Sequence, residues 1–480
     1  MLSANPATTE GTNQGLLLEL SLTGVPRGRE ASALITRLRD AVRGGSLPTG
    51  TRLPPSRVLA EDLGVSRGVV VRVYEQLSAE GYLTARQGSG TEVAAVPRQP
   101  RPVPLPPVRP SSNPGLPAGA QFPRAAWLRS AQRAMAGLPD ADLGYGDPAG
   151  YPKLRAELSA YLGRVRALIA PPERIMIVNG FGQASRLLAE VLAGRGIREI
   201  GLEDPGSAGL REQLSGAGVT CVPVPVDAQG VRVDALADSG VRAIVVTPAH
   251  QFPTGVVMSA ERRHALLTWA RGTGGLVIED DYDAEFRYDR TPVGALQGLG
   301  PDVVVYGGSA SKILAPGLRI GWLAVPHELV SAVAAAKYAA DLGSDIWAQA
   351  TLADFLARGE LDRHIRVMTI RYRALRDRLV AELADRLADW SVTGTEAGLH
   401  LLVRPPAGLD EVALAALAQR AGLDARPLSQ YSVARLDRPG LVIGYGHLRP
   451  DAIASGVARM ARHLADRHAR RRPVAGTRHE

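Results

Sequence analysis

Apolar side chains recur at helical spacing near the start of the chain. They form one face of a helix predicted over residues 30–44, which ends at a pair of glycines. Two more helices are predicted, one over residues 56–63 capped by Ser56, and one that Ser66 caps and Gly81 closes, with Gly64 permitting the tight turn between them. Two short strands, 82–84 and 91–93, follow. This order predicts a winged helix-turn-helix with core positions Leu34, Leu38, Ala41, Val42, Val70, Val73 and Leu77.

The pattern changes beyond residue 120. Short, continuous, β-branched apolar runs now alternate with helical segments, at 175–178, 244–246, 276–278 and 303–305. Such runs are typical of strands in a mostly parallel sheet that helices cover on both faces. The sequence therefore predicts a large α/β domain, and the residues after about 390 predict a smaller C-terminal α+β lobe.

A proline-rich stretch separates these two parts. Residues 97–117 contain nine prolines, and proline at this density favours an extended, semi-rigid spacer. We therefore divide the chain into a flexible tail (1–23), the winged helix-turn-helix (24–96), a linker (97–119), the large domain with its smaller lobe (120–465) and a basic tail (466–480).

Composition narrows the classes of protein. The chain shows no long apolar run that would span a membrane and no secretory signal at its start, so we expect a cytoplasmic protein without a membrane partner. Cys221 is its only cysteine, which excludes an intrachain disulfide and a multi-cysteine metal site. The net charge is +8, and the basic excess lies in residues 24–113 and the last twenty, while 114–460 is neutral. This distribution is compatible with nucleic-acid binding.

The N-terminal motifs are specific. The spacing Pro55-Ser56-Arg57…Gly64-Val65-Ser66-Arg67…Tyr74…Leu77…Gly81-Tyr82-Leu83…Gly88-Ser89-Gly90-Thr91 closely resembles the GntR family of bacterial regulators over residues 30–93. A helix that begins at Ser66 presents its first residues to base edges, and arginine is well shaped for guanine. The resemblance implies a double-stranded DNA operator. It also implies DNA contacts by Arg52, Arg57, Ser66, Arg67 and Arg72, and by Gln87 and Gly88 at the wing tip.

One departure from the family leaves the operator sequence open. Gly68 stands where relatives often carry asparagine or threonine, which removes one base contact. The alternative interpretation of the arginines is an ordinary solvated face.

A second motif carries chemistry. In the segment Gly307–Trp322, Lys312 follows a predicted strand and supplies the amine that pyridoxal phosphate needs for a Schiff base. Ser309, Ser311 and Arg319 stand at spacings suited to the phosphate group. The segment predicts a pyridoxal 5'-phosphate site.

Upstream segments agree with this prediction. A carboxylate that keeps the pyridine nitrogen protonated makes the cofactor an electron sink, and a tyrosine can hydrogen-bond its phenolic oxygen. Resemblance to aminotransferase-like regulators assigns these roles to Asp280 and Tyr282, with Asp281 as the alternative. His250 lies in a segment similar to the HQFPTG form of an aminotransferase loop. Gly182 and Gln183 lie where a helix opens after a strand, a place that can hold phosphate.

Together the two halves resemble MocR-type regulators, a GntR subfamily fused to a fold-type-I aminotransferase domain, over about residues 30–460. The resemblance implies that 24–96 binds DNA, that 120–465 binds pyridoxal phosphate, and that the protein is a homodimer, with exchange of the DNA-binding domains between protomers left open. The segment Tyr145–Arg155 matches the family's YGDPxGxxxLR motif. The histidines show no zinc-ligand spacing, so we expect no metal.

Two departures concern the effector. Ser207 follows the segment EDPG where many relatives have an aromatic residue to stack on the cofactor. The strand Leu441–Tyr445 lacks the arginine that clamps a substrate carboxylate in active aminotransferases, and Arg211, Arg426 and Arg435 are candidate substitutes. Their roles stay open.

Three functions are compatible with these motifs. The first is a transcription regulator that responds to pyridoxal phosphate or to an amine that reacts with it. Its expected target is vitamin B6 synthesis, with GABA or other amine metabolism as the alternative. The second is a working aminotransferase with a DNA-binding appendage, and the third is a scaffold without cofactor. We expect the aminotransferase-like domain to act as a sensor, with residual transamination open. The sequence does not distinguish an activator from a repressor.

Overall fold

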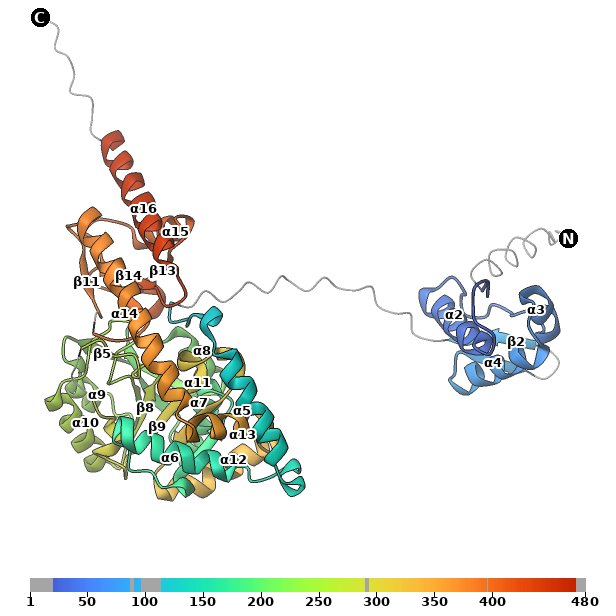
Figure 1. The fold of residues 1–480 in the computed structure, drawn as a ribbon, viewed down its shortest axis with the longest axis horizontal. Coiled ribbons are helices and arrows are strands. Elements are labelled where there is room, and N and C mark those ends of the chain that lie inside the picture. Colours follow the sequence, from blue (N-terminus) through green and yellow to red (C-terminus); the bar gives the residue numbers. More distant parts are fainter. Residues whose placement is uncertain (1–19, 87–89, 96–113, 290–292, 395, 472–480) are drawn as a thin grey trace, which may run out of the picture. The chain divides into compact units, whose positions relative to one another are not determined.

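The computed structural model describes residues 20–86, 90–95, 114–289, 293–394 and 396–471 (Figure 1). The chain divides into two compact units, residues 1–109 and 110–480. The division falls inside the predicted proline-rich linker. Each unit has its own core and is described by itself.

The first unit is a winged helix-turn-helix, as predicted. Its elements are α2 (Glu30–Gly44), α3 (Ser56–Leu63), α4 (Arg67–Ala79), β1 (Leu83–Arg86) and β2 (Gly90–Val93). The two strands pair antiparallel, with Leu83 opposite Val93. The predicted core positions are all buried in one apolar cluster of this unit. The periodic apolar pattern, together with the glycines at turns and helix ends, was enough to find these elements.

The helix starts differ in detail from the prediction. Ser56 is the first residue of α3, and Pro55 takes the cap position, so the predicted capping by Ser56 is wrong. Ser66 does precede α4 as its cap residue, but its side chain makes no capping hydrogen bond. The Ser66 hydroxyl, which is exposed, is therefore not committed to the helix.

The second unit is built on an eight-stranded sheet. The strand order is β3 (Ile175–Val178), β10 (Gly321–Ala324), β9 (Val304–Ser309), β8 (Leu276–Asp281), β7 (Ala243–Val246), β4 (Glu199–Asp204), β5 (Thr220–Asp227) and β6 (Gly230–Val231). The five strands from β9 to β5 run parallel. β10 is antiparallel to both of its neighbours, and β6 is antiparallel to β5. The mostly parallel sheet is confirmed.

Helices cover both faces of this sheet. On β7, Ala243 and Val245 join one apolar cluster, whereas Ile244 and Val246 join another. This alternation explains why the strand reads as one continuous apolar run. The helices are α5 (Arg124–Gly137), α6 (Pro152–Arg166), α7 (Phe181–Gly194), α8 (Ala208–Gly216), α9 (Val233–Asp238), α10 (Ala260–Thr273), α11 (Ala310–Ile313), α12 (Val330–Asp341) and α13 (Ile346–Ala357).

A smaller α+β lobe follows, also as predicted. The long helix α14 (Glu360–Arg386) leads into an antiparallel sheet in the order β11 (Ser391–Thr393), β12 (His400–Arg404), β14 (Leu441–Gly444) and β13 (Asp424–Pro427). Two helices, α15 (Glu411–Arg420) and α16 (Pro450–Arg471), complete it (Figure 1). The helix α16 continues beyond residue 465, where the large domain was predicted to end.

The end of the predicted linker packs against this lobe. The Ala118 backbone N–H donates a hydrogen bond to the Tyr372 hydroxyl on α14, at 3.0 Å. Gly444 lacks a Cβ where one would lie 2.2 Å from the Pro114 carbonyl oxygen. Residues 114–119 therefore belong to the second unit. None of the helices in the described parts of the chain has the length and apolar character needed to cross a membrane.

Candidate functional site

A cavity of about 560 Å³ lies at the carboxyl ends of the parallel strands. The strands β4, β8 and β9 all end there, and segments of the C-terminal lobe close it. Parallel strands deliver their carboxyl ends to one edge, which is where open α/β sheets bind ligands. Most of the predicted cofactor residues line this cavity: Gly182, Asp280, Tyr282, Ser309, Ser311, Lys312 and Arg319.

Lys312 lies on the one-turn helix α11, directly after β9. Its side chain is half-buried on the cavity wall. Burial lowers the pKa of the Lys312 amine, against the opposing influence of Asp283 and Asp280. An amine with a lowered pKa is a better nucleophile near neutral pH.

Asp280 and Asp281 are adjacent on β8 but face opposite ways. Burial raises the pKa of Asp280 to about 8, the neighbouring Asp281 adds to the rise, and Lys312 opposes it. Asp281 instead pairs with Arg166 at 2.7 Å and accepts a hydrogen bond from the Tyr306 hydroxyl at 2.8 Å. Asp281 is therefore committed to the fold, and Asp280 is the carboxyl group that faces the cavity.

The N-terminus of α7 forms one end of the cavity. Its cap residue is Gly180, whose φ of +85° suits glycine, and a Cβ there would lie 3.3 Å from the Arg319 guanidinium. Arg319 donates a hydrogen bond to the Asn179 carbonyl at 2.5 Å, which holds its positive charge beside the helix start. Backbone N–H groups at a helix start, together with an arginine, are suited to an anion such as phosphate.

Gln183 is placed elsewhere. It is not among the cavity-lining residues. Its side-chain oxygen accepts a hydrogen bond from the Asn179 N–H at 2.8 Å, and its amide donates to Asp341 at 2.7 Å. Lys337, which is fully buried, donates to the same carboxylate at 2.6 Å. Gln183 thus braces the start of α7 rather than pointing at the cavity.

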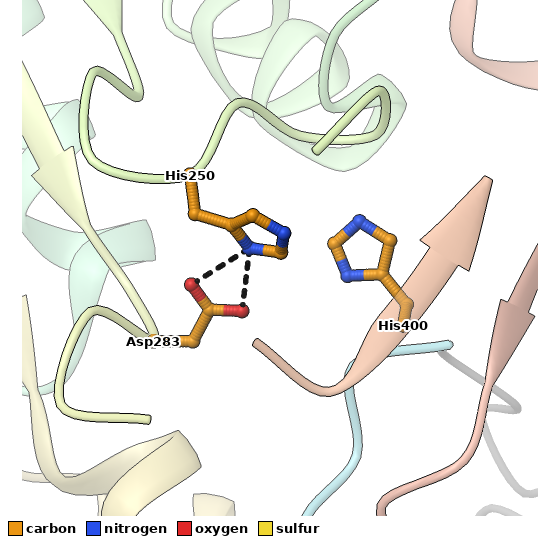
Figure 2. A group of neighbouring side chains, drawn as sticks. All are labelled: His250, Asp283 and His400. Atoms are coloured by element: carbon orange, nitrogen blue, oxygen red, sulfur yellow. Dashed lines mark hydrogen bonds and ion pairs between the residues drawn. The ribbon is translucent and has the colours of Figure 1, made fainter. Parts of the chain in front are cut away.

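His250 is not among the cavity-lining residues, and Figure 2 shows its ring beside Asp283 and His400. Its Nδ1 is 3.1 Å from the Tyr282 hydroxyl and 3.1 Å from Asp283 Oδ2. The His400 ring from β12 packs beside it, with ring centroids 5.0 Å apart. His250 therefore meets the cavity through Tyr282 rather than directly.

Glu203, at the end of β4, is a cavity residue that sequence reasoning did not single out. It accepts hydrogen bonds from the Thr247 N–H at 3.1 Å, the Thr247 hydroxyl at 2.6 Å and the Gln251 amide at 3.1 Å. Burial raises the pKa of Glu203 to about 7, against these hydrogen bonds. The EDPG segment was the available signal, but it says nothing about which way the glutamate faces.

Both departures from the family pattern, Ser207 and the missing arginine of the C-terminal strand, concern this cavity. Ser207 lines it and caps α8, accepting a hydrogen bond from the Leu210 N–H at 3.2 Å. Arg426 of β13 also lines it, and the strand register places Arg426 opposite Val442 of β14, the strand that lacks the arginine of active aminotransferases. Arg211 and Arg435 are not among the lining residues. Of the three candidate substitutes, only Arg426 reaches the cavity.

The first unit presents its predicted DNA residues to solvent. Its exposed candidates are Arg52, Arg57, Ser66, Arg67 and Arg72. Arg57 forms an ion pair with Glu61 at 3.5 Å, but its side chain is 81% exposed, so this pair holds it weakly. Gln87 and Gly88 lie outside the described residues.

Comparison with known proteins identifies both units. Residues 30–93 match the gntR family of bacterial regulatory proteins, and residues 112–467 match aminotransferase class I and II. The probable rhizopine catabolism regulatory protein MocR of Rhizobium meliloti is 34% identical, over 90% of this chain and 92% of that protein. The pyridoxine biosynthesis regulator PdxR of Corynebacterium glutamicum is 33% identical, over 88% of this chain and 92% of that one. The chain belongs to the MocR-type regulators of the gntR family.

Solved structures agree for the second unit. An archaeal alanine:glyoxylate aminotransferase superposes with a TM-score of 0.68 at 27% identity, covering 73% of this chain and 89% of that one. The multiple substrate aminotransferase of Thermococcus profundus gives 0.67 at 27% identity, covering 74% and 91%. This MocR-type regulator therefore carries a DNA-binding domain and an aminotransferase domain whose cofactor is pyridoxal phosphate.

The cavity fits this cofactor. It combines the Lys312 amine, the Asp280 carboxyl group, the Tyr282 phenol and the anion-binding start of α7 with Arg319. Asp280 is a buried carboxyl group with a raised pKa, so a cationic pyridine nitrogen beside it would supply the charge partner it lacks. When bound, pyridoxal phosphate supplies an electron sink for amines.

Proposed function

We propose that this regulator binds its DNA operator as a homodimer, that its cavity holds pyridoxal 5'-phosphate through a Schiff base to Lys312, and that DNA binding responds to the cofactor or to an amine that reacts with it. The observation that carries this proposal is the convergence of Lys312, Asp280 and Arg319 on one cavity. Asp280 comes from one segment of the sequence and Lys312 and Arg319 come from another, so the fold is what brings the two segments to one cavity.

Each cavity residue has a separate role in binding the cofactor. Asp280 holds the pyridine nitrogen, and Tyr282 donates to the phenolic oxygen. Gly182 N–H, Arg319 and the hydroxyls of Ser309 and Ser311 would hold the phosphate at the start of α7. The lowered pKa of Lys312 supports its role as the attached amine. His250 and Gln183 act behind these groups, as their contacts indicate.

On the DNA side, α4 enters the major groove. Ser66 and Arg67 stand at the start of α4, where a recognition helix meets base edges. Arg52, Arg57 and Arg72 contact phosphates or flanking bases, and Gln87 and Gly88 at the wing tip contact the minor groove or backbone. Because the protein is a dimer, its operator has two related half-sites. Exchange of the DNA-binding units between protomers is the arrangement that the long linker permits.

Exposed apolar side chains on the second unit support the homodimer. Leu128 and Met135 on α5 are 58% and 57% exposed, and Tyr145 is 83% exposed. Apolar surface of this kind marks an interaction site when it gathers in one region. Tyr145 lies in the YGDPxGxxxLR motif, which the resemblance puts at the mouth of the active site.

The proposed target is vitamin B6 synthesis, with the cofactor as its own signal. The similarity to PdxR, named for pyridoxine biosynthesis, supports this choice. A second candidate is an amine signal with a carboxylate, because Arg426 lines the cavity. The third candidate function, sustained transamination, uses the same residues. A turnover assay with amino donors and keto acids tests it. A regulator of this kind acts in the bacterial cytoplasm, on the nucleoid when bound to DNA.

The experiment is an absorption titration of the full-length protein with pyridoxal phosphate. We expect a saturating visible band in the wild type and none in Lys312→Ala, with Lys153→Ala as the control because Lys153 is exposed on α6. A band that persists in Lys312→Ala contradicts the attachment site. The absence of a band in the folded wild type contradicts cofactor sensing altogether.

A further inference from the structure

We propose that Asp283 and His250 position the Tyr282 hydroxyl, so that its single hydrogen is donated into the cavity toward the phenolic oxygen of the cofactor. The proposal rests on the proposed placement of the cofactor next to Tyr282. Asp283 and His250 are positioning residues, because neither is among the cavity-lining residues.

The argument begins with the Nδ1 atom of His250. Asp283 approaches this one nitrogen with both oxygens, at 3.1 and 3.2 Å. A carboxylate only accepts hydrogen bonds, so Nδ1 must carry the hydrogen, whether the ring is neutral or cationic. The same nitrogen lies 3.1 Å from the Tyr282 hydroxyl oxygen. Since the protonated Nδ1 has no lone pair to offer, the Tyr282 hydroxyl cannot donate to it, and its oxygen shares the one Nδ1 hydrogen with Asp283.

The consequence falls on Tyr282. Burial raises the pKa of its phenol well above the usual value, and nearby Asp283 adds to the rise, so the hydroxyl keeps its hydrogen. With its oxygen accepting from His250, that hydrogen is left to point elsewhere. Tyr282 lines the cavity, which is where an oxygen atom of the cofactor would receive it.

The surroundings keep the His250 ring in place. Asp283 is 1% exposed and His250 is 2% exposed. Gly398 allows their close approach, because a Cβ there would lie 2.2 Å from His250 Cε1 and 2.5 Å from Asp283 Oδ2. His400 packs against the other side of the ring, and burial lowers its pKa well below the usual value, so it is neutral. Figure 2 shows that His400 comes from a strand, β12, whereas His250 and Asp283 lie on loops.

A metal ion is the competing interpretation of the same side chains. Ligand atoms of His250, Asp283 and His400 lie within 4.8 Å of one another. However, Asp283 contacts His250 at Nδ1, which leaves only Nε2 of that ring for a metal. A site of two imidazoles, with the carboxylate behind one of them, has fewer ligands than a structural or catalytic zinc site uses. The hydrogen-bonded arrangement accounts for the contacts of His250 Nδ1 without a metal.

The experiment measures the visible band of the full-length protein loaded with pyridoxal phosphate as a function of pH. A hydrogen bond donated to the phenolic oxygen stabilises its negative form, so losing the bond raises the pH at which the band changes. We expect Tyr282→Phe to raise this midpoint by about one pH unit or more, the size expected for one hydrogen bond to a charged group. His250→Leu should raise it by a similar amount.

Double variants distinguish a positioning role of His250 from a general disturbance of the site. In the Tyr282→Phe background, His250→Leu should cause no further shift, because there is no hydroxyl left to position. His250→Asn, whose amide nitrogen can take the place of Nδ1, should restore most of the wild-type midpoint. Asp283→Asn also removes a charge that raises the pKa of Lys312, so it should move the midpoint further upward in the presence of the Tyr282 hydroxyl than in the Tyr282→Phe background, where only the charge effect remains. His264→Leu is the control, since His264 is exposed on α10. Melting of the cofactor-free variants shows which of them are folded.

The results that would contradict the proposal can be distinguished from those that would contradict the proposed function. The proposal is overturned if the midpoint shifts of Tyr282→Phe and His250→Leu add in the double variant. It is also overturned if folded His250→Leu has the wild-type midpoint. If Tyr282→Phe itself has no effect, the placement of Tyr282 is wrong and the proposal falls with it. If the wild type shows no band, the proposed function fails first. A stoichiometric metal in the purified wild type, absent from His400→Phe, overturns the hydrogen-bonded arrangement.

Discussion

The predicted DNA-contacting arginines of the first unit and the buried Arg166 of the second unit are held in opposite ways. In the first unit, Arg52, Arg57, Arg67 and Arg72 are exposed, so their side chains should contribute little to the stability of the fold. In the second unit, Arg166 is buried and pairs with Asp281 at 2.7 Å, both side chains being at most 4% exposed. Exposed arginines are available to a charged partner such as DNA, whereas buried ones are part of the fold. The same replacement should therefore act on binding in one unit and on stability in the other.

The largest effect is expected for the buried pair. Arg166→Met leaves the Asp281 carboxylate without its charge partner in the interior, which should cost about 3–5 kcal/mol of unfolding free energy. Urea unfolding of residues 110–480 in the full chain measures this loss. Arg271→Met is the matched control: Arg271 pairs with Asp302 at 2.9 Å with both side chains about half exposed, so its loss should cost about 0–1 kcal/mol. Equal losses would show that burial does not distinguish the two pairs.

The second prediction concerns pH and the cavity carboxyl group. The pKa of Asp280 is about 8 in the folded chain against an ordinary 3.8. Between these values the folded state holds a proton that the unfolded state has released, so stability falls as pH rises through this window. Glu203, with a pKa of about 7, acts in the same direction.

Replacing Asp280 by asparagine should therefore make the cofactor-free protein lose less stability between about pH 4 and 8. Melting temperatures across this range test it. Asp140→Asn, an exposed carboxylate at the surface, is the control and should leave the slope as it is. An unchanged slope in Asp280→Asn would mean that the Asp280 carboxyl is ionised in the folded chain.

The third prediction returns to the exposed arginines. Arg67→Ala should weaken operator binding by about 1–3 kcal/mol, roughly fivefold to 150-fold, and relax the base preference at one position. Fluorescence anisotropy with a selected duplex measures it, and Arg449→Ala in the C-terminal lobe is the control. An unchanged affinity would remove α4 from the interface.

The smallest effect is expected at Arg57. Its pair with Glu61 is exposed, so Arg57→Ala should change the unfolding free energy by less than about 0.5 kcal/mol. If Arg57 contacts a phosphate, the dependence of binding on salt should weaken by about one unit of slope. A loss of stability larger than that of Arg271→Met would contradict the contrast between the two units.

Much of the fold could be predicted because it depends on local pattern. The run at 175–178 coincides with β3, and the helix at 30–44 coincides with α2. The strand Leu276–Asp281 shows what the local sequence pattern does not predict, namely which of its side chains face the cavity. The sequence could not separate Asp280 from Asp281, because only the pleat decides which one faces the cavity.

Tertiary contacts decided the remaining site residues. Gln183 and His250 lie in the predicted segments but point at Asp341 and Asp283, which are far away in the sequence. Glu203 and Arg426 reach the cavity from a strand end and from a separate lobe. No spacing along the chain encodes either position.

The most direct test of the central claim joins the two units. Operator affinity should be measured with and without pyridoxal phosphate, for the wild type and for Lys312→Ala. The account predicts that the cofactor changes wild-type affinity by about fivefold or more, the usual scale of coupling between sites, and leaves Lys312→Ala unchanged. Equal affinities for the wild type with and without cofactor would contradict sensing by pyridoxal phosphate itself. A cofactor response retained in Lys312→Ala would contradict the role of the lysine.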